Sequence, residues 1–248
     1  PAEVLWVVPP RQGMLTVELV AALGVMAGAK PEHLPLPIAT VEAMAHPVPA
    51  WRGPTTTTAA TVPVFFISGP IIDKQKLNPG TGTAGGENPV TNALGYFVNL
   101  VGDVVGGSVP PNFDKSTHGS SADLVAMVFT ENAKENPWKT TYAEEAGFKP
   151  GDSIVTHFSA YLGNANIDHD SKTGQRLLTT LSTGLLGSAS GLASCLADYD
   201  ATYAINNKVS FAFIVLCTEH AATLAKDFPD PRAARAFIRD TAATTPKC

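Results

Sequence analysis

The amino-acid sequence predicts an α/β fold with a mostly parallel sheet flanked by helices. Short apolar runs alternate along the chain with segments of helical periodicity, and 44% of the residues are hydrophobic, enough for a substantial core. The 248 residues are expected to form a single domain, 1–248, or two intimately packed halves of about 1–110 and 111–248. The stretches VFFISGPIIDKQKL and FAFIVLCTEHAATLAKDF share a strand-then-helix pattern, which would make such halves pseudo-symmetric.

Five apolar runs, rich in β-branched and aromatic residues, are expected to be strands. Pro9 and Pro10 follow the first run, Ser68-Gly69-Pro70 follows the second, and polar loops follow the third and fourth. The fifth run, SFAFIVL, leads directly into a helix. The runs are residues 4–8, 62–68, 124–130, 154–160 and 210–216.

Segments with apolar residues at helical spacing lie between these strands. Thr16 is a candidate N-cap for the first, and Asn88-Pro89 is a typical start for the apolar helix after a glycine-rich loop. Residues 177–197 carry no charge, but serine, threonine and glycine fill much of this stretch, which favours buried or glycine-broken helices over a membrane span. The expected helices are 16–27, 38–45, 90–105, a short one within 139–150, the region 177–197 and the segment after 216.

Charge and composition exclude some classes of partner. The net charge is −5 and lysine and arginine do not cluster, so neither nucleic acid nor an anionic membrane surface is an expected partner. Only 16% of the residues are charged, which indicates either an unusually buried chain or a surface partly covered by other subunits, and we favour the second. We therefore expect a homo-oligomer that binds a small-molecule ligand.

The cysteines and the N-terminal sequence indicate a cytoplasmic protein. Cys195, Cys217 and Cys248 are too few and too odd in number for a disulfide framework, which favours a reducing compartment. The N-terminal PAEVLWVV lacks the features of a secretion signal. Because the chain has no HxxxH, HExxH or CxxC motif, no metal ligand is assigned, and the cofactor is unknown.

The stretch NPGTGTAGGENP, residues 78–89, is a glycine-rich loop that ends at a helix start. Such a loop can turn several N–H groups toward one polar or anionic ligand. Its letters fit GxGxxG, but no strand directly precedes it, so dinucleotide binding is disfavoured and a structural turn is the alternative. The candidate ligand-binding residues are Gly80, Thr81, Gly82, Thr83, Gly85, Asn88, Asn92 and, from a later polar loop, His118.

The candidate catalytic residues follow two of the expected strands. Cys217 lies between the run 210–216 and the next helix, where a helix dipole favours a thiolate; a buried core cysteine is the alternative. Glu219 and His220 supply the two groups that titrate nearest neutrality and so suit proton transfer. Glu131 follows the run 124–130 in the same way, so we expect it at the same sheet edge, faced by the glycine-rich loop.

Three further features have simpler interpretations. A second Glu-His pair occurs at Glu32-His33, but neighbouring residues of a helix diverge and rarely share one ligand. The sequence DHD at 168–170 predicts a solvated turn, and Trp138 is expected to anchor a loop.

Several stretches resemble a bacterial family of largely uncharacterised proteins often encoded beside UGSC-motif (seleno)proteins. They are TVELVAALGVMAGAKPEHLPLPIATVEAM, the GP of FISGP, NPVTNALGYFVNLVG, FTENAKENPW and EHAATLA. The resemblance spans most of the chain and implies no established activity. The family commonly has a cysteine where this chain has Ala29, and often none at the position of Cys217, so the resemblance gives most weight to the EHA motif at 219–221.

A shorter likeness concerns VLCTEH, which looks like the second cysteine motif of the aspartate/glutamate racemase superfamily. The first-half counterpart would fall near Ser68-Gly69, where this chain has no cysteine. The likeness therefore implies a one-cysteine decarboxylase or isomerase rather than a two-base racemase.

Together these features predict an enzyme that acts on a small polar or anionic organic molecule by acid/base or nucleophilic chemistry, of hydrolase, lyase or isomerase type. The alternative is a non-catalytic or half-site subunit that binds a small ligand and completes its site with a partner chain. The low charge and the expected genomic neighbour favour that alternative.

Overall fold

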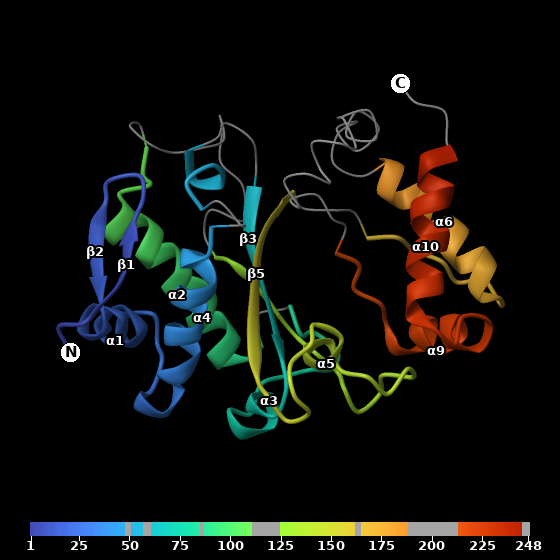
Figure 1. The fold of residues 1–248 in the computed structure, drawn as a ribbon, viewed down its shortest axis with the longest axis horizontal. Coiled ribbons are helices and arrows are strands. Elements are labelled where there is room, and N and C mark those ends of the chain that lie inside the picture. Colours follow the sequence, from blue (N-terminus) through green and yellow to red (C-terminus); the bar gives the residue numbers. More distant parts are fainter. Residues whose placement is uncertain are drawn as a thin grey trace. The chain divides into compact units, whose positions relative to one another are not determined.

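The structure is a computed structural model that describes residues 1–47, 51–56, 61–84, 87–110, 125–161, 165–187 and 213–244. The chain divides into two compact units (Figure 1). Unit 1 comprises Pro1–Ala133 and Thr141–Tyr161, and unit 2 comprises Lys134–Thr140 and Leu162–Cys248. The expected choice between one domain and two intimately packed halves stays a prediction.

The first expected strand forms, but it belongs to a hairpin and not to the main sheet. β1 (Val4–Val8) is antiparallel to β2 (Gly13–Thr16), with Val7 opposite Met14. The connection is so short that the neighbouring segment is the nearest available pairing partner.

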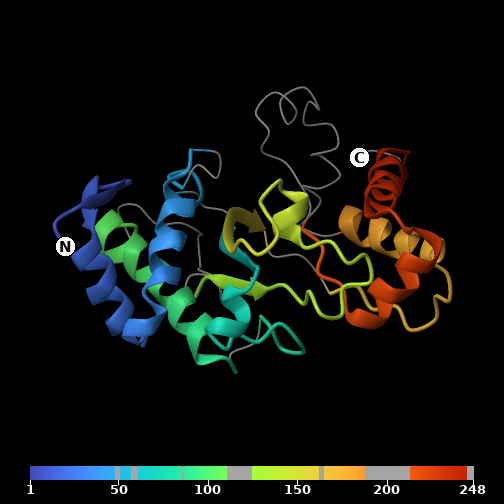
Figure 2. The same cartoon turned by 60° about the horizontal axis from the view of Figure 1, so that its bottom comes forward.

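Three helices of unit 1 pack on one another: α1 (Val17–Met26), α2 (Pro35–Ala45) and α4 (Pro89–Leu100) (Figure 2). α1 begins as predicted, because the Thr16 hydroxyl accepts a hydrogen bond from Leu19 N at 3.2 Å. α2 begins at Pro35, three residues earlier than predicted. Proline is compatible with the first turn of a helix, because the N–H group that it lacks would have no partner within the helix there. The short elements beside these helices are η1 (Pro31–His33), η2 (Pro54–Thr56), α3 (Ile71–Lys74) and the π-helical turn η3 (Val101–Gly106).

Unit 1 contains a three-stranded mixed sheet in the order β4-β3-β5. β4 (Met127–Thr130) is parallel to the central β3 (Thr61–Ser68), and β5 (Ile154–Tyr161) is antiparallel to it. The runs expected at 62–68 and 154–160 are strands, and the run expected at 124–130 is a strand from Met127 on, whereas residues 125 and 126 have no regular secondary structure. A mostly parallel sheet is not shown. The connection from β4 to β5 contains α5 (Tyr142–Glu145).

The core of unit 1 lies between the sheet and the helices α1, α2 and α4. Phe65 and Ile67 of β3 and Val128 of β4 belong to it. Phe66 points to the other face of the sheet, where its ring meets Tyr142 of α5 at 5.1 Å between centroids. Helical elements therefore flank both faces. Full burial of one large apolar side chain is worth roughly 1.5–3 kcal/mol.

Among the described residues of unit 2, the regular secondary structure is helical. Its helices are α6 (Gly174–Gly187), α9 (Thr218–Asp227) and α10 (Pro231–Thr244), and they share an apolar cluster around Leu177, Leu178 and Leu224. The strand expected at 210–216 is wrong for residues 213–216, which have no regular secondary structure. Ile214 and Leu216 pack against the helical cluster instead of a neighbouring strand. The pseudo-symmetry that relied on this strand is not shown, and residues 210–212 lie outside the described part.

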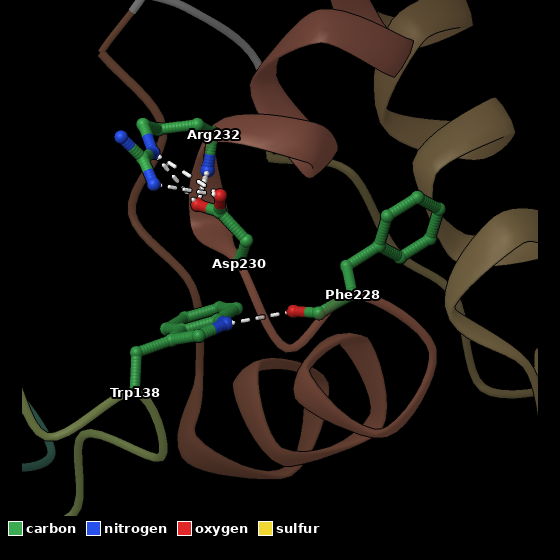
Figure 3. A network of polar contacts seen from close by, with 4 residues as sticks. All are labelled: Trp138, Phe228, Asp230 and Arg232. Atoms are coloured by element: carbon green, nitrogen blue, oxygen red, sulfur yellow. Dashed lines mark hydrogen bonds and ion pairs between the residues drawn. The ribbon is translucent and has the colours of Figure 1, made fainter.

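Trp138 anchors the loop 134–140 to the corner between α9 and α10, as predicted. Its Nε1 donates a hydrogen bond to the Phe228 carbonyl oxygen at 2.8 Å (Figure 3). In the same corner the Arg232 guanidinium pairs with the Asp230 carboxylate at 3.0 Å and lowers its pKa, chiefly through the hydrogen bond between these two side chains. Among the described residues, every helix falls short of the length and apolar character that a membrane span requires.

Candidate functional site

The glycine-rich loop is tied to the end of β4. Asn78 begins it with a turn in which Oδ1 accepts a hydrogen bond from Gly80 N at 3.0 Å and Nδ2 donates to Thr81 O at 2.8 Å. Thr83 Oγ1 accepts from Thr130 N at 3.1 Å, and the Thr130 hydroxyl donates to Asn78 O at 2.5 Å. The Thr83 hydroxyl therefore donates to Thr130 Oγ1, at 3.0 Å. Thr130 directly precedes Glu131, so the loop and that strand end lie together as expected.

The tip of this loop faces solvent. Thr81 and Gly82 are exposed, and Gly82 has a φ of +78°, a left-handed conformation that glycine adopts without strain. The tip is thus the part of the loop that a ligand could reach. Gly85 and His118, two of the predicted ligand-binding residues, lie outside the described part of the chain.

Asn88 and Asn92 belong to the start of α4. Asn88 Oδ1 accepts hydrogen bonds from Val90 N at 3.0 Å and Thr91 N at 3.1 Å, and its Nδ2 donates to Lys76 O at 2.9 Å. The side-chain amide is thereby used as the helix N-cap, as the Asn88-Pro89 pattern predicted. Asn92 lies in the first turn, where its N–H donates to Asn88 O at 3.1 Å. Ligand binding by these two residues stays a prediction.

Glu131 joins the ends of β3 and β4 to α5. The Ser68 hydroxyl donates a short hydrogen bond to Glu131 Oε2, and Tyr142 N donates to Oε1 at 2.7 Å. Ser68 is fully buried, and its Oγ accepts from Ala143 N at 3.2 Å. Both carboxylate oxygens are thus engaged in linking the strand ends to α5, and a catalytic role for Glu131 stays a prediction. Sequence reasoning missed Ser68 as its partner; the only signal was the end of a predicted strand.

Cys217 and Glu219 lie at the start of α9 in unit 2. Cys217 is the N-cap residue, and both side chains are exposed, so the alternative of a buried core cysteine is wrong. The pKa of the Glu219 carboxyl is lowered, first by a hydrogen bond from its own backbone N–H and then by one from the Cys217 thiol. The thiol and the carboxylate are therefore close neighbours.

His220 follows on the same helix and is held by a loop of unit 2. Its Nε2 lies 2.9 Å from the Asp168 carbonyl oxygen, and the residue is half-buried. Because a carbonyl oxygen only accepts hydrogen bonds, Nε2 carries the proton, and Nδ1 of the neutral ring is a proton acceptor. This contact fixes both the tautomer and the orientation of the imidazole.

The Asp168 carboxylate holds the loop that positions His220. Its Oδ1 accepts hydrogen bonds from Ser171 N at 2.8 Å and Asp170 N at 3.1 Å, and its Oδ2 accepts from the hydroxyls of Ser171 and Thr180, both at 2.7 Å. These bonds, those from Ser171 foremost, hold the pKa of the Asp168 carboxyl well below its ordinary range. The turn predicted at DHD is present. Its contact with His220 through the Asp168 carbonyl oxygen could not be predicted from the sequence, because every residue has a backbone carbonyl group.

The structure thus places the predicted residues in two groups. The glycine-rich loop and Glu131 lie in unit 1, whereas Cys217, Glu219 and His220 lie in unit 2. Cys217 follows the irregular residues 213–216 and not a sheet strand. The strand that was expected to place Cys217 at the same sheet edge as Glu131 is therefore wrong for these residues. A single site made of both groups stays a prediction. Among the described residues, no three histidine, cysteine, aspartate or glutamate side chains form a metal-binding group.

The protein is thus an α/β protein in which Cys217, Glu219 and His220 lie together at the start of α9. The imidazole of His220 is hydrogen-bonded to a backbone carbonyl oxygen. Comparisons with protein-family models, with curated proteins and with solved structures gave no match.

Proposed function

We propose that this protein is an enzyme that moves a proton on a small polar or anionic organic molecule, with His220 as the acid/base residue. The observation that carries the proposal is the 2.9 Å contact between His220 Nε2 and the Asp168 carbonyl oxygen. A base must keep one ring nitrogen unprotonated and correctly aimed, and a hydrogen bond at the opposite nitrogen does both.

The neighbouring side chains supply complementary chemistry. Nδ1 of His220 takes a proton from the substrate, the electron pair of the broken bond stays on the substrate, and the imidazolium returns the proton to the product. The exposed Cys217 thiol is a second proton donor or a nucleophile, and the Glu219 carboxylate beside it accepts a proton or a hydrogen bond. Hydrolase, lyase and isomerase reactions all use such steps.

The exposed tip of the glycine-rich loop supports a second part of the proposal, a binding site for a polar or anionic group. Thr81 offers a hydroxyl there, and Gly82 lets the backbone approach a ligand closely. The bonds that tie Thr83 and Asn88 to unit 1 support a rigid base for that tip.

Proton exchange with solvent tests the acid/base proposal without a known net reaction. The protein is incubated in D₂O with a panel of small acids, such as succinate, malate, aspartate and glutamate, and ¹H NMR follows the signal of the proton beside the carboxylate. We expect the protein to accelerate loss of this signal for at least one acid. Absence of acceleration for every acid would make this substrate class wrong.

Two matched variants assign the effect to His220. His220→Gln keeps a donor for the Asp168 carbonyl but has no base, and it should slow the exchange by a factor of about 10²–10⁴. His33→Gln is the control, because His33 belongs to the other Glu-His pair. The Nδ1 atom of His33 accepts a hydrogen bond from Lys30 N at 3.1 Å, and this substitution should leave the exchange rate unchanged. A folded His220→Gln protein with the wild-type rate would overturn the assignment.

A half-site subunit is the second candidate function, and exposed apolar side chains favour it. Met14, Val25 and Met26 are 67%, 66% and 68% exposed. Exposed apolar side chains that gather in a patch often mark the surface to which another subunit binds. Native mass spectrometry of the protein alone and with the product of its neighbouring gene separates the two cases, since an active homomer contradicts a need for a partner.

The remaining parts of the proposal rest on sequence. Membership of the bacterial family associated with UGSC-motif proteins is supported by the EHA motif at 219–221. A cytoplasmic location is supported by the low cysteine content, and a homo-oligomer by the low fraction of charged residues.

A further inference from the structure

Unit 1 contains buried polar atoms without normal hydrogen-bond partners on α2, on β5 and on Trp51 beside them. Within the described residues no atom lies at normal hydrogen-bond distance and angle from Thr40 Oγ1, Trp51 Nε1 or Ser159 Oγ, and the only polar contact of the His157 ring is with the Ala43 backbone, outside that normal geometry. Thr40 is 0% exposed, Trp51 4% and His157 7%. Buried polar atoms are almost always hydrogen-bonded to protein or to ordered water, so the unpaired atoms of these side chains require an explanation.

The four side chains belong to segments that contact one another: Thr40 lies on α2, His157 and Ser159 lie on β5, and the Trp51 ring lies beside that of His157. His157 and Ser159 are two residues apart on β5 and so point to the same face, toward α2. The His157 ring stacks on Phe65 at 4.7 Å between centroids and lies 5.7 Å from the Trp51 ring. Thr40 lies about one helical turn before Ala43, whose backbone acts as a hydrogen-bond partner of the His157 ring and raises its pKa.

The chemistry of these atoms defines what could bind among them. Burial lowers the pKa of His157 to about 4, against the smaller opposite effect of a hydrogen bond to the Ala43 backbone, so the ring is neutral at pH 7. A neutral imidazole has one donor and one acceptor, the indole of Trp51 only donates, and the two hydroxyls do both. An uncharged partner that both donates and accepts hydrogen bonds matches this set.

We propose that Thr40, Trp51, His157 and Ser159 form an internal binding site for a small uncharged hydrogen-bonding molecule. Water and a small neutral organic molecule share this chemistry. The aromatic rings of Trp51 and Phe65 border the His157 ring and keep charged species out by desolvation. None of these four residues belongs to the loop tip or to the start of α9.

NMR of the unmodified full-length protein tests the proposal directly. Resonances of the Trp51 indole proton and the His157 ring protons should show nuclear Overhauser contacts to a bound molecule. An Overhauser effect to protons at the chemical shift of water identifies bound water. An Overhauser effect to carbon-bound protons that do not belong to the protein identifies an organic molecule. Absence of both kinds of contact would overturn the proposal.

The sign of a stability change gives an independent test. Thr40→Val and His157→Phe replace polar atoms by apolar ones of similar shape. If a bound molecule forms hydrogen bonds with these atoms, each substitution removes one of those hydrogen bonds. Each variant should then have a folding equilibrium constant about tenfold lower than that of the wild-type protein. If the atoms are unsatisfied, both substitutions should raise it, which would contradict the proposal.

Thr91→Val supplies the matched reference. Thr91 is 4% exposed, and its hydroxyl donates to the Asn88 carbonyl oxygen at 3.2 Å. This variant measures the loss of one buried hydrogen bond to a known partner. We expect Thr40→Val to lower the folding equilibrium constant by a similar factor, and a gain in stability confined to Thr40→Val would count against the internal site.

Discussion

Ser68 at the end of β3 donates its hydroxyl hydrogen to the Glu131 carboxylate at the end of β4. The two residues come from neighbouring parallel strands, and the same carboxylate accepts a hydrogen bond from Tyr142 N at the start of α5. One buried serine and one carboxylate thus close the end of the sheet and hold the helix that covers its second face. This explains why Glu131, which sequence reasoning placed among the catalytic residues, has both oxygens engaged.

Ser68→Ala should destabilise unit 1 by about 1–3 kcal/mol, because it removes a buried hydrogen bond to a charged group. Urea denaturation followed by tryptophan fluorescence measures the loss. Ser153→Ala is the control: the Ser153 hydroxyl accepts from Ile71 N at 3.0 Å in an exposed position, so the loss should stay below about 1 kcal/mol. Equal losses in the two variants would contradict a special role for the Ser68–Glu131 bond.

Acid should destabilise the protein through His157. Its folded-state pKa is about 4 and its ordinary value is 6.5, so between these values the unfolded chain binds the proton and the folded protein does not. The free energy of unfolding should therefore fall as the pH drops from about 6.5 to 4, by roughly 3 kcal/mol in total from this residue. Urea midpoints at several pH values measure the slope.

His157→Phe provides the control for this pH dependence. The variant has no group that titrates in this window at position 157, so its stability should change less between pH 6.5 and 4 than that of the wild-type protein. Its stability at pH 7 is a separate quantity and depends on the proposed internal site. An unchanged pH slope in His157→Phe would show that other groups cause the acid sensitivity.

Asp168→Asn should loosen the imidazole of His220 without changing that residue. The substitution removes one of the carboxylate oxygens that hold the turn through Ser171 and Thr180. We expect a smaller population of the tautomer with the proton on Nε2, measured by long-range ¹H–¹⁵N NMR of the histidine rings. Asp170→Asn, a change at a neighbouring exposed position, should leave the tautomer unchanged; equal effects of both variants would argue against positioning by Asp168.

Features set by neighbouring residues were predictable from the sequence, whereas features set by distant partners were not. The caps at Thr16 and Asn88 and the apolar run of β3 follow from residues within a few positions, and all three are present. Residues 213–216 have the composition of a strand, but their partner is a helical cluster, which no local pattern specifies. For the candidate site, Glu219-His220 was recognisable as a motif, whereas the Asp168 carbonyl could not be found because a backbone group has no sequence signature.

Gly69→Ala should be among the most damaging single substitutions in unit 1. Gly69 has a φ of +100°, and a Cβ there would lie 2.2 Å from the Asp152 carbonyl oxygen. Backbone strain and this collision together should cost at least about 3 kcal/mol. Gly147→Ala separates the two effects, because Gly147 has a φ of +88° but nothing within 4 Å of an added Cβ. Strain alone should cost that variant about 1 kcal/mol, and thermal denaturation of both variants should therefore show a clearly lower midpoint for Gly69→Ala. Equal midpoints would mean that the strand end yields to make room for the added methyl group.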